Sequence, residues 1–560
     1  MTFLTDSPFA LDADGVAWVE STLEGMTVER KVGQLMCLYL RSVDMAEFTS
    51  WLDRRGIEPG GMMMIARPRV DAKRDVAALQ QWSNVPLLMS GNLESGAVNF
   101  LEETEAFANP MQVAATRDPL SAERLAIHAA RTGNEIGINW AFAPVLDVVF
   151  NVHNPIVNTR AFSSDPSLVA ELGERYISVL EARGVATSPK HFPGDGVDDR
   201  DQHLVTSNND LSAEEWWASF GAVYRSAIAA GARTMMVGHI RQRALSRALS
   251  PELADAEIMP ATLSPELVTG VLRDRLLFNG MIVSDNSSMT GFTSVMPREQ
   301  ALTRAVNAGV DMILGNVDVE TDYHILLAAA QSGEIAASRL DDAVRRILAT
   351  KASIGLHIET DRSGWEQPNS TEENRWRLEL ARKSITLVKD TQNLLPLTAS
   401  SHRRALVCVL GDEPTFYDPS GPFAPQFIAG LESRGVTVTV RPVPGPPATP
   451  VEAELLHERF DLCIYFANVR FIGNQNVVRL AWSPWQGYDA PRHVATLPTV
   501  LVSIADPYLL QDVPMIKTAL NGYTPTPATV EAMLEALFGE TTPTGASPID
   551  PFAGHWDAAL

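Results

Sequence analysis

Eight short apolar runs recur along the first part of this chain, and helical patterns separate them. Each run is bounded by Gly, Pro or Asn, as is typical of short buried strands. The runs span residues 32–40, 59–66, 86–92, 137–148, 184–190, 234–240, 280–285 and 311–316. Regular alternation of strand and helix predicts a parallel sheet wrapped by helices. Eight such pairs predict an α/β fold, a (β/α)8 TIM-like barrel over residues 1–356.

The pattern of the barrel ends in a polar stretch, and a second domain follows it. Residues 357–374 are expected to form a linker, since they lack apolar periodicity. A helix is expected over 375–390, and further strands within 404–412, 436–443, 461–469 and 499–510. We therefore expect residues 375–560 to form a smaller α/β sandwich domain. In the barrel, Ser121 and Ser212 each open a Ser-Ala-Glu sequence, which predicts helix N-caps.

Charge and cysteine usage exclude several classes of protein. The 45 basic and 68 acidic residues leave a net charge of −23, which repels nucleic acid and anionic membrane surfaces. Cys37, Cys408 and Cys463 stand singly in apolar runs, so no disulfide framework or metal pair is expected. The N-terminus lacks a signal peptide pattern, and no run of 18 apolar residues occurs. The simplest expectation is a soluble cytoplasmic protein.

Familiar cofactor and hydrolase signatures are absent from the sequence. It contains no GxxxxGK[ST] phosphate loop, no GxGxxG fingerprint, no HExxH pair and no GxSxG elbow. Nucleotide-driven, metal-hydrolytic and serine-hydrolase functions lose support. No metal and no organic cofactor is predicted.

Polar residues follow six of the eight predicted strands. Catalytic groups of a (β/α)8 barrel gather at this carboxyl edge, although any strand can end in a polar residue. The residues are Asn92 and Glu94, Asp147, Lys190 and His191, His239, Asp285, and Asn316. Their recurrence predicts an active site built from several strand ends.

Three of the polar residues suit the cleavage of a glycosidic bond, which needs a proton donor and a carboxylate. Asp285 ends a stiff strand and is placed to be the carboxylate, although a turn-capping aspartate is the alternative. Asp201 and His203 form an Asp-x-His unit, in which a carboxylate can orient an imidazole as proton donor. A solvated acidic loop with one histidine is the plainer alternative for this unit.

The stretch KHFPGDGVDDRDQH, residues 190–203, resembles the long loop motif of glycoside hydrolase family 3. The motif of its bacterial β-N-acetylglucosaminidase branch is KH[FI]PG[HL]Gx4D[ST]H. The sequence departs from it at Asp195 and Gln202. NWAFAPVLDV, NTRAFSSDPSLV, FNGMIVSDNSSMTGF, AVNAGVDMILGN and ARKSITLVKDTQNLLPL extend the resemblance over both domains.

The resemblance implies a retaining mechanism on a β-linked carbohydrate. Asp285 would form a glycosyl-enzyme, and His203, backed by Asp201, would protonate the leaving group and then activate water. Lys190, His191 and Arg160 would hold hydroxyls of the terminal sugar. The second domain would then serve as a lid or as a dimer surface, so a homodimer is an open alternative.

One family motif is altered in this chain. The strand-three motif resembles DxEGGxxxR, whose aspartate and arginine contact the terminal sugar, whereas NLESGAVNF places Asn92 and Phe100 there. An amide and an apolar ring bind hydroxyls less strongly than the charged pair. We therefore expect a reshaped sugar pocket and a modified or differently configured N-acetylhexosamine as substrate. By their strand-end positions Asp147 and His239 are expected to line the same pocket.

Two other functions stay open at this point. A β-N-acetylglucosaminide phosphorylase is one, because a histidine acid does not repel phosphate, although four loop aspartates disfavour it. A barrel that binds sugars without catalysis is the other. Joint retention of Asp285, Asp201 and His203 favours the enzyme.

Overall fold

The computed structural model describes residues 2–40, 44–102, 104–358, 370–414, 420–444, 455–470, 473–484, 487 and 489–560. It separates into two compact units. The first contains Met1–Thr104, Ala122–Asn151 and Pro166–Gln367, and the second contains Glu105–Ser121, Val152–Asp165 and Pro368–Leu560. Most of the predicted linker, residues 359–369, lies outside the described residues. The predicted division at 356 and 375 therefore stays a prediction.

The first unit is a parallel barrel, as predicted. Its strands are Met36–Leu40 (β1), Gly61–Met64 (β2), Leu88–Gly91 (β3), Trp140–Ala141 (β4), Ala186–Thr187 (β5), Thr234–Val237 (β7), Met281–Ser284 (β9) and Ile313–Leu314 (β10). They pair in the order β10-β1-β2-β3-β4-β5, with β7 beside β9. Parallel bridges from Phe192 to Val237 and from Val283 to Met312 join these two groups into a ring. Every residue of β3, β7 and β9 is buried, which suits strands covered on both faces.

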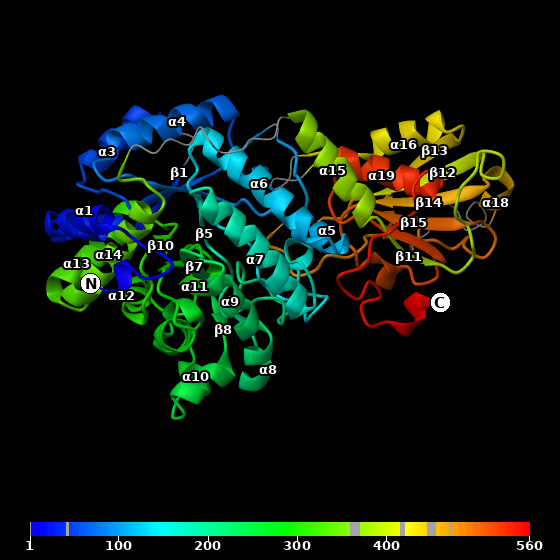
Figure 1. Ribbon diagram of the computed structural model, residues 1–560. Helices are drawn as coiled ribbons and strands as arrows, with labels where there is room; N and C mark the ends of the chain where they lie inside the picture. Colours follow the sequence, from blue (N-terminus) through cyan, green and yellow to red (C-terminus); the bar gives the residue numbers. More distant parts are fainter. Residues whose placement is uncertain are drawn as a thin grey trace. The chain divides into compact units, whose positions relative to one another are not determined.

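Helices follow the barrel strands and surround them (Figure 1). They are Ala13–Glu24 (α1), Val28–Gln34 (α2), Met45–Asp53 (α3), Arg69–Trp82 (α4), Pro119–Ile136 (α6), Pro166–Ala182 (α7), Ala213–Ala218 (α8), Phe220–Ala229 (α9), Arg243–Leu249 (α10), Thr290–Thr293 (α11), Arg298–Ala308 (α12), Val319–Ser332 (α13) and Ala337–Ser353 (α14). A π-helix, Glu266–Arg275, precedes β9. A short pair, Ser207–Asn208 (β6) and Ile240–Arg241 (β8), lies outside the ring.

The two predicted N-caps have different outcomes. Ser212 caps α8, because its side chain accepts from the amide of Glu215 and the Glu215 carboxylate accepts from Ser212 in return. The prediction for Ser121 is wrong, since α6 already begins at Pro119. Pro suits a first helical turn because it lacks an amide hydrogen that would be unpaired there.

The second unit contains a mixed six-stranded sheet in the order β11-β16-β15-β14-β12-β13. Its strands are Thr386–Asp390 (β11), Arg404–Leu410 (β12), Thr437–Val443 (β13), Leu462–Ala467 (β14), Thr499–Ser503 (β15) and Thr518–Asn521 (β16). Its helices are Pro110–Ala115 (α5), Ser370–Ser384 (α15), Ala424–Ser433 (α16), Leu456–Arg459 (α18) and Pro527–Leu537 (α19). The helix predicted over 375–390 is wrong in its last turn, where β11 pairs antiparallel with β16.

Alternate residues of the central strands supply two separate apolar layers. Ala405 and Val407 of β12 belong to a layer with Phe427 of α16, whereas Leu406 and Cys408 belong to the layer on the other face. This period of two is that of a strand buried on both faces. The expected smaller α/β sandwich is therefore present.

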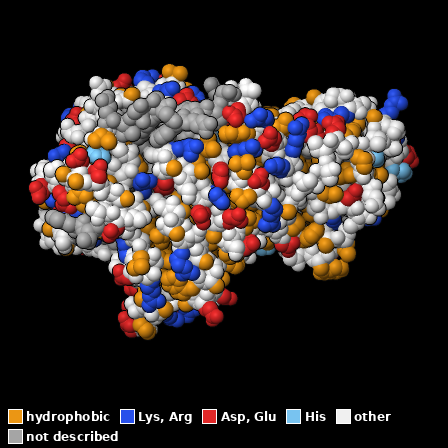
Figure 2. Space-filling view, viewed as in Figure 1, with side chains coloured by type: hydrophobic (Ala, Val, Ile, Leu, Met, Phe, Trp, Pro, Cys, Tyr) orange, Lys and Arg blue, Asp and Glu red, His pale blue; other side chains and the backbone are white. Residues whose placement is uncertain are grey.

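The visible surface mixes charges of both signs. Figure 2 shows acidic and basic side chains interspersed over one face, among scattered apolar ones. Within the described residues, no helix is both long enough and apolar enough to cross a membrane.

Candidate active site

Asp285 stands directly after β9, at the carboxyl edge of the barrel. Its amide donates to the carbonyl of Val237 at 2.8 Å, which fixes the backbone against β7. The carboxylate accepts from the amide of Asn286 at 2.7 Å, and its side chain is 13% exposed. Burial alone would raise the pKa of Asp285, but His191, His239 and His203 outweigh it and lower that pKa below its ordinary value. Asp285 is thus an ionised carboxylate at neutral pH.

His191 connects Asp285 to a second buried carboxylate. Its Nδ1 lies 2.7 Å from Oδ2 of Asp147, and its Nε2 lies 3.9 Å from Oδ2 of Asp285. The other oxygen of Asp147 accepts from the amides of His191 at 3.1 Å and Asp195 at 2.7 Å. Since Asp147 is fully buried and holds three donors, it fixes the imidazole ring so that Nε2 faces Asp285.

His239 is fully buried and linked to the nucleophile loop. Its Nε2 lies 3.0 Å from the carbonyl oxygen of Asn286, and its Nδ1 lies 2.8 Å from the hydroxyl of Thr262. A carbonyl only accepts, so Nε2 carries the hydrogen. Burial lowers the pKa of His239, although Asp285 acts in the opposite direction. The ring therefore supports the turn after Asp285 through its hydrogen bond to Asn286.

The predicted dyad is present in the loop after β5. Nδ1 of His203 lies 2.6 Å from Oδ1 of Asp201, and the same oxygen accepts from the amide of His203 at 2.8 Å. Asp201 is fully buried, whereas the side chain of His203 is 35% exposed. The carboxylate thus holds the ring by one nitrogen and leaves Nε2 as the atom for proton transfer.

Gln202 lies between the two dyad residues and anchors the loop. Its Oε1 accepts from the amide of His239 at 2.9 Å, and its Nε2 donates to Asp195 at 3.4 Å. The carbonyl oxygens of Gln202 and His203 also accept from the amides of Gly291 and Thr290, just after the Asp285 turn. The acid/base loop is therefore hydrogen-bonded to the nucleophile loop. Asp195 and Gln202 are the two departures from the family motif, and they contact each other.

Lys190 and Asn92 lie together at the ends of β5 and β3. The ammonium of Lys190 donates to Asn92 Oδ1 at 3.2 Å and pairs with Glu94 at 2.6 Å. The side chains of Lys190 and Glu94 are both buried, with 4% and 5% of their surface exposed. Glu94 therefore joins the candidate site, although the sequence marked it only as a strand-end residue.

Phe100 and Arg160 are predicted substrate contacts with different surroundings. The ring of Phe100 is fully buried and packs against Gly91, where an added Cβ would lie 2.8 Å from a ring carbon. Arg160 ends a short 3-10 helix, Asn158–Arg160, in the second unit, and it donates to the carbonyl of Ile156 at 3.1 Å. Substrate contacts of these two residues stay predictions.

No individual role was predicted for Asp195 and Gln202, and Glu94 was predicted only as one of the strand-end residues. The only sequence signal for the first two was that both positions depart from the motif. Their pairing depends on the loop conformation, which residue spacing does not determine. Within the described part of the chain, no cluster of three His, Cys, Asp or Glu side chains is arranged to hold a metal ion.

Comparison with known proteins identifies the family. The model of the glycosyl hydrolase family 3 N terminal domain matches residues 27–350. The chain belongs to glycoside hydrolase family 3. The predicted family and its glycoside hydrolase class are therefore confirmed, and the fold prediction agrees with them.

Individual relatives cover the whole chain or nearly all of it. A beta-N-acetylglucosaminidase/beta-glucosidase from Cellulomonas fimi is 43% identical over 566 residues, which span 100% of both chains. A solved structure titled beta-glucoside phosphorylase BglX is 38% identical, with a TM-score of 0.92 over 100% of this chain and 99% of its own. A family 3 beta-N-acetylglucosaminidase from Paenibacillus sp. str. FPU-7 is 26% identical, with a TM-score of 0.78 over 94% and 99%.

Proposed function

We propose that this chain is a retaining, exo-acting β-glycosidase whose substrate carries a terminal β-linked N-acetylhexosamine or a related modified amino sugar. The observation that carries the proposal is the joint position of Asp285, His191 and the Asp201–His203 dyad at one edge of the barrel. The Cellulomonas relative supports the substrate class by its name and its full-length identity.

In the first step, Asp285 attacks the anomeric carbon and a carbon–oxygen ester bond forms. The glycosidic bond breaks, its electron pair stays on the leaving oxygen, and that oxygen takes a proton from Nε2 of His203. In the second step, Nε2 removes a proton from water while the oxygen of that water bonds to the anomeric carbon. The ester bond breaks, and the carboxylate of Asp285 is regenerated.

The surrounding side chains support this assignment of roles. Asp147 keeps His191 directed at Asp285, so an imidazole lies beside the nucleophile. Lys190, held by Asn92 and Glu94, offers ammonium hydrogens to sugar hydroxyls. We propose His239, Arg160 and Phe100 as parts of the sugar pocket or its support. A cytoplasmic location and a homodimer likewise stay proposals.

The test is release of p-nitrophenol from aryl β-glycosides of N-acetylglucosamine, N-acetylgalactosamine, glucose and xylose. The unmodified chain should turn over at least one of them, and Asp285→Ala should reduce turnover to background. His203→Ala should lower kcat by about 10²–10⁴-fold, the usual contribution of general acid–base catalysis. If the gluco epimer is turned over best by a wide margin, the expectation of a modified sugar is wrong.

A phosphorylase is the second candidate, because a solved relative of the same length carries that title. Two of the four loop aspartates that disfavoured it are paired. Asp198 binds the guanidinium of Arg200 at 2.7 Å, and Asp201 binds His203. The same assays with inorganic phosphate separate the two candidates, since a phosphorylase releases sugar 1-phosphate and gains rate with phosphate.

A further inference from the structure

Arg298, the first residue of α12, contacts the turn that carries Asp285. One terminal nitrogen of its guanidinium donates to the carbonyl of Ser287, and the other donates to the Ser287 hydroxyl at 2.9 Å. Ser287 is fully buried and lies two residues after Asp285. Arg298 takes no part in the chemistry of the proposed reaction, but its two hydrogen bonds reach the segment that carries the nucleophile.

A buried carboxylate holds this guanidinium in place. Asp322 of α13 accepts from Nε of Arg298 at 2.9 Å and from a terminal nitrogen at 2.6 Å. The side chain of Asp322 is only 2% exposed. A planar guanidinium that is paired through two of its nitrogens has a fixed direction, which the single ammonium of a lysine would not share. The ion pair therefore directs the other guanidinium hydrogens at Ser287.

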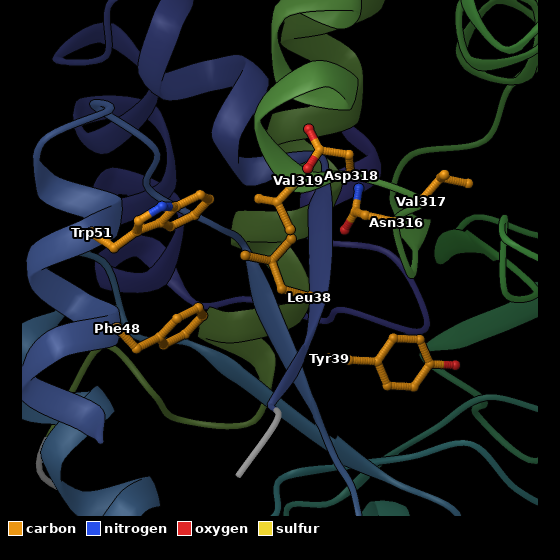
Figure 3. A pocket seen from close by; sticks show the side chains of 8 residues that line it. All are labelled: Leu38, Tyr39, Phe48, Trp51, Asn316, Val317, Asp318 and Val319. Atoms are coloured by element: carbon orange, nitrogen blue, oxygen red, sulfur yellow. The ribbon is translucent and has the colours of Figure 1, made fainter. Parts of the chain in front are cut away.

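The same carboxylate fixes the loop that follows the next strand. Asn316 and Val317 lie in the loop that leads from β10 to α13 (Figure 3). The side-chain nitrogen of Asn316 donates to Asp322 at 3.1 Å, and the amide of Val317 donates to it at 3.3 Å. Ser287 joins the two loops directly, since its hydroxyl donates to the carbonyl of Gly315 at 2.6 Å. The ion pair thus couples the loop after β9 to the loop after β10.

The turn after Asp285 is fixed at successive residues. The amide of Asn286 donates to the Asp285 carboxylate at 2.7 Å, and the carbonyl of Asn286 receives the hydrogen bond from His239. Arg298 supplies a further anchor through Ser287. A shift of Ser287 would move the neighbouring peptide group, whose N–H meets the carboxylate oxygen. The direction in which the carboxylate faces the substrate therefore depends on this anchor.

We propose that Arg298, fixed by Asp322, is a positioning residue that holds the turn so that the Asp285 carboxylate meets the anomeric carbon in line. The inference rests on the proposed glycosidase function. Attack by Asp285 is required whatever the leaving group is, so loss of Arg298 slows the cleavage of activated and unactivated glycosides alike. Arg298 differs in this respect from the acid/base loop, whose disturbance spares a leaving group that needs no proton.

A second buried ion pair supplies a matched control. Arg339 pairs with Asp311 at the amino ends of β9 and β10, and its side chain is 18% exposed, as is that of Arg298. Arg339 also donates to backbone carbonyls, those of Val306 at 3.0 Å and Val310 at 3.1 Å. Arg298→Lys and Arg339→Lys therefore remove comparable contacts at opposite ends of the same two strands.

The experiment measures kcat/KM of these two variants on two glycosides of the sugar that the unmodified chain prefers. One carries 2,4-dinitrophenol, which departs without a proton, and the other carries an unactivated alkyl group. Arg298→Lys should lower kcat/KM by about ten- to a hundred-fold on both, which is the scale of a displacement of about 1 Å at a reacting group. Arg339→Lys should leave both values nearly unchanged, and the Tm of each variant shows its effect on stability.

Three results would overturn the proposal. They are equal losses of kcat/KM in the two variants, no loss in Arg298→Lys, and a loss in Arg298→Lys that is confined to the unactivated glycoside. The last result would assign Arg298 to proton donation instead. If Arg298→Lys does not fold, Asp322→Asn takes its place, because the amide keeps one acceptor oxygen but cannot hold the guanidinium by charge. The same loss on both glycosides is expected, and its absence would overturn the proposal.

Failure of the proposed function has a different signature. If the unmodified chain turns over none of the aryl glycosides, the glycosidase assignment fails, and amide hydrogen exchange at residues 285–290 is measured in its place. Faster exchange there in Arg298→Lys than in Arg339→Lys would support Arg298 as the anchor of the turn. Equal exchange in the two variants would overturn it.

Discussion

Replacement of Gln202 by serine tests whether the acid/base loop owes its position to one buried amide. Gln202 is fully buried, and its Oε1 accepts from the amide of His239 at 2.9 Å. Serine is too short to keep this bond, so a buried N–H loses its acceptor at a cost of about 1–3 kcal/mol. The bond to Asp195 is 3.4 Å long and adds less. If the whole cost reaches the transition state, kcat/KM falls by roughly 5- to 150-fold.

The assay separates proton donation from other effects by the choice of leaving group. An alkyl or sugar leaving group needs a proton from His203, whereas 2,4-dinitrophenolate departs without one. Gln202→Ser should therefore lower kcat/KM on the unactivated glycoside and leave the value for the 2,4-dinitrophenyl glycoside nearly unchanged. Because kcat/KM reports only the first chemical step, the role of His203 as base in the second step does not interfere.

A reversed pair provides the control. In Asp195→Asn/Gln202→Glu the carboxylate of position 202 accepts from the His239 amide and from the new amide at 195, so the loop keeps its anchors. On the unactivated glycoside, this double variant should have a higher kcat/KM than Gln202→Ser. Equal losses on both leaving groups, or a lowered Tm with unchanged kinetics, would refute a positioning role for Gln202.

Two buried titratable groups predict how stability depends on pH. Burial lowers the pKa of Lys351 to about 7, whereas the value in an unfolded chain is about 10.4. The buried amine therefore contributes fully to stability above about pH 10.4, and this contribution declines as the pH falls toward 7. Thermal unfolding of Lys351→Met between pH 7 and 9 should lack this slope, and an unchanged slope would contradict the assignment. Burial raises the pKa of Asp506 to about 6, against about 3.9 unfolded, so its contribution is full below pH 4 and is lost as the pH rises through 6. Asp506→Asn should remove the decline in stability between pH 4 and 6, as measured by denaturant unfolding at fixed temperature.

The barrel could be predicted from the sequence because each strand is buried on both faces and reads as a continuous apolar run. The first and last residues of the strands could not be predicted in this way. The run at 32–40 contains the end of α2, since Thr27 caps that helix and the chain stays helical up to Gln34. The strand β11 was read as helix because its pairing with β16 joins residues about 130 positions apart, and no local pattern records such a pairing.

The candidate site was predicted as a set of strand ends, and its internal partners were not. Position alone brought Asp147, His191 and Asp285 to one edge. The loop after Lys190 orients His191, so that its Nδ1 faces Asp147 and its Nε2 faces Asp285. The same loop brings the amides of His191 and Asp195 to one carboxylate oxygen of Asp147. The prediction that Phe100 meets the substrate followed from aligning a motif, which does not reveal that the ring packs against Gly91.

Three aspartates of this site have the same side chain and different chemistry, and their surroundings account for the difference. Asp147 and Asp201 are fully buried, and each lies at hydrogen-bond distance from the Nδ1 of a histidine. Each therefore acts on the proposed reaction by orienting that imidazole ring. Asp285 keeps 13% exposure and faces the Nε2 of His191 at 3.9 Å, which is too far for a hydrogen bond but close enough to stabilise a carboxylate. This combination suits a nucleophile, because an oxygen engaged by a short hydrogen bond would lose reactivity, whereas a nearby imidazole counteracts the rise in pKa that burial causes. The Asp147–His191 pair therefore helps to lower the pKa of Asp285 and leaves its Oδ2 available for attack.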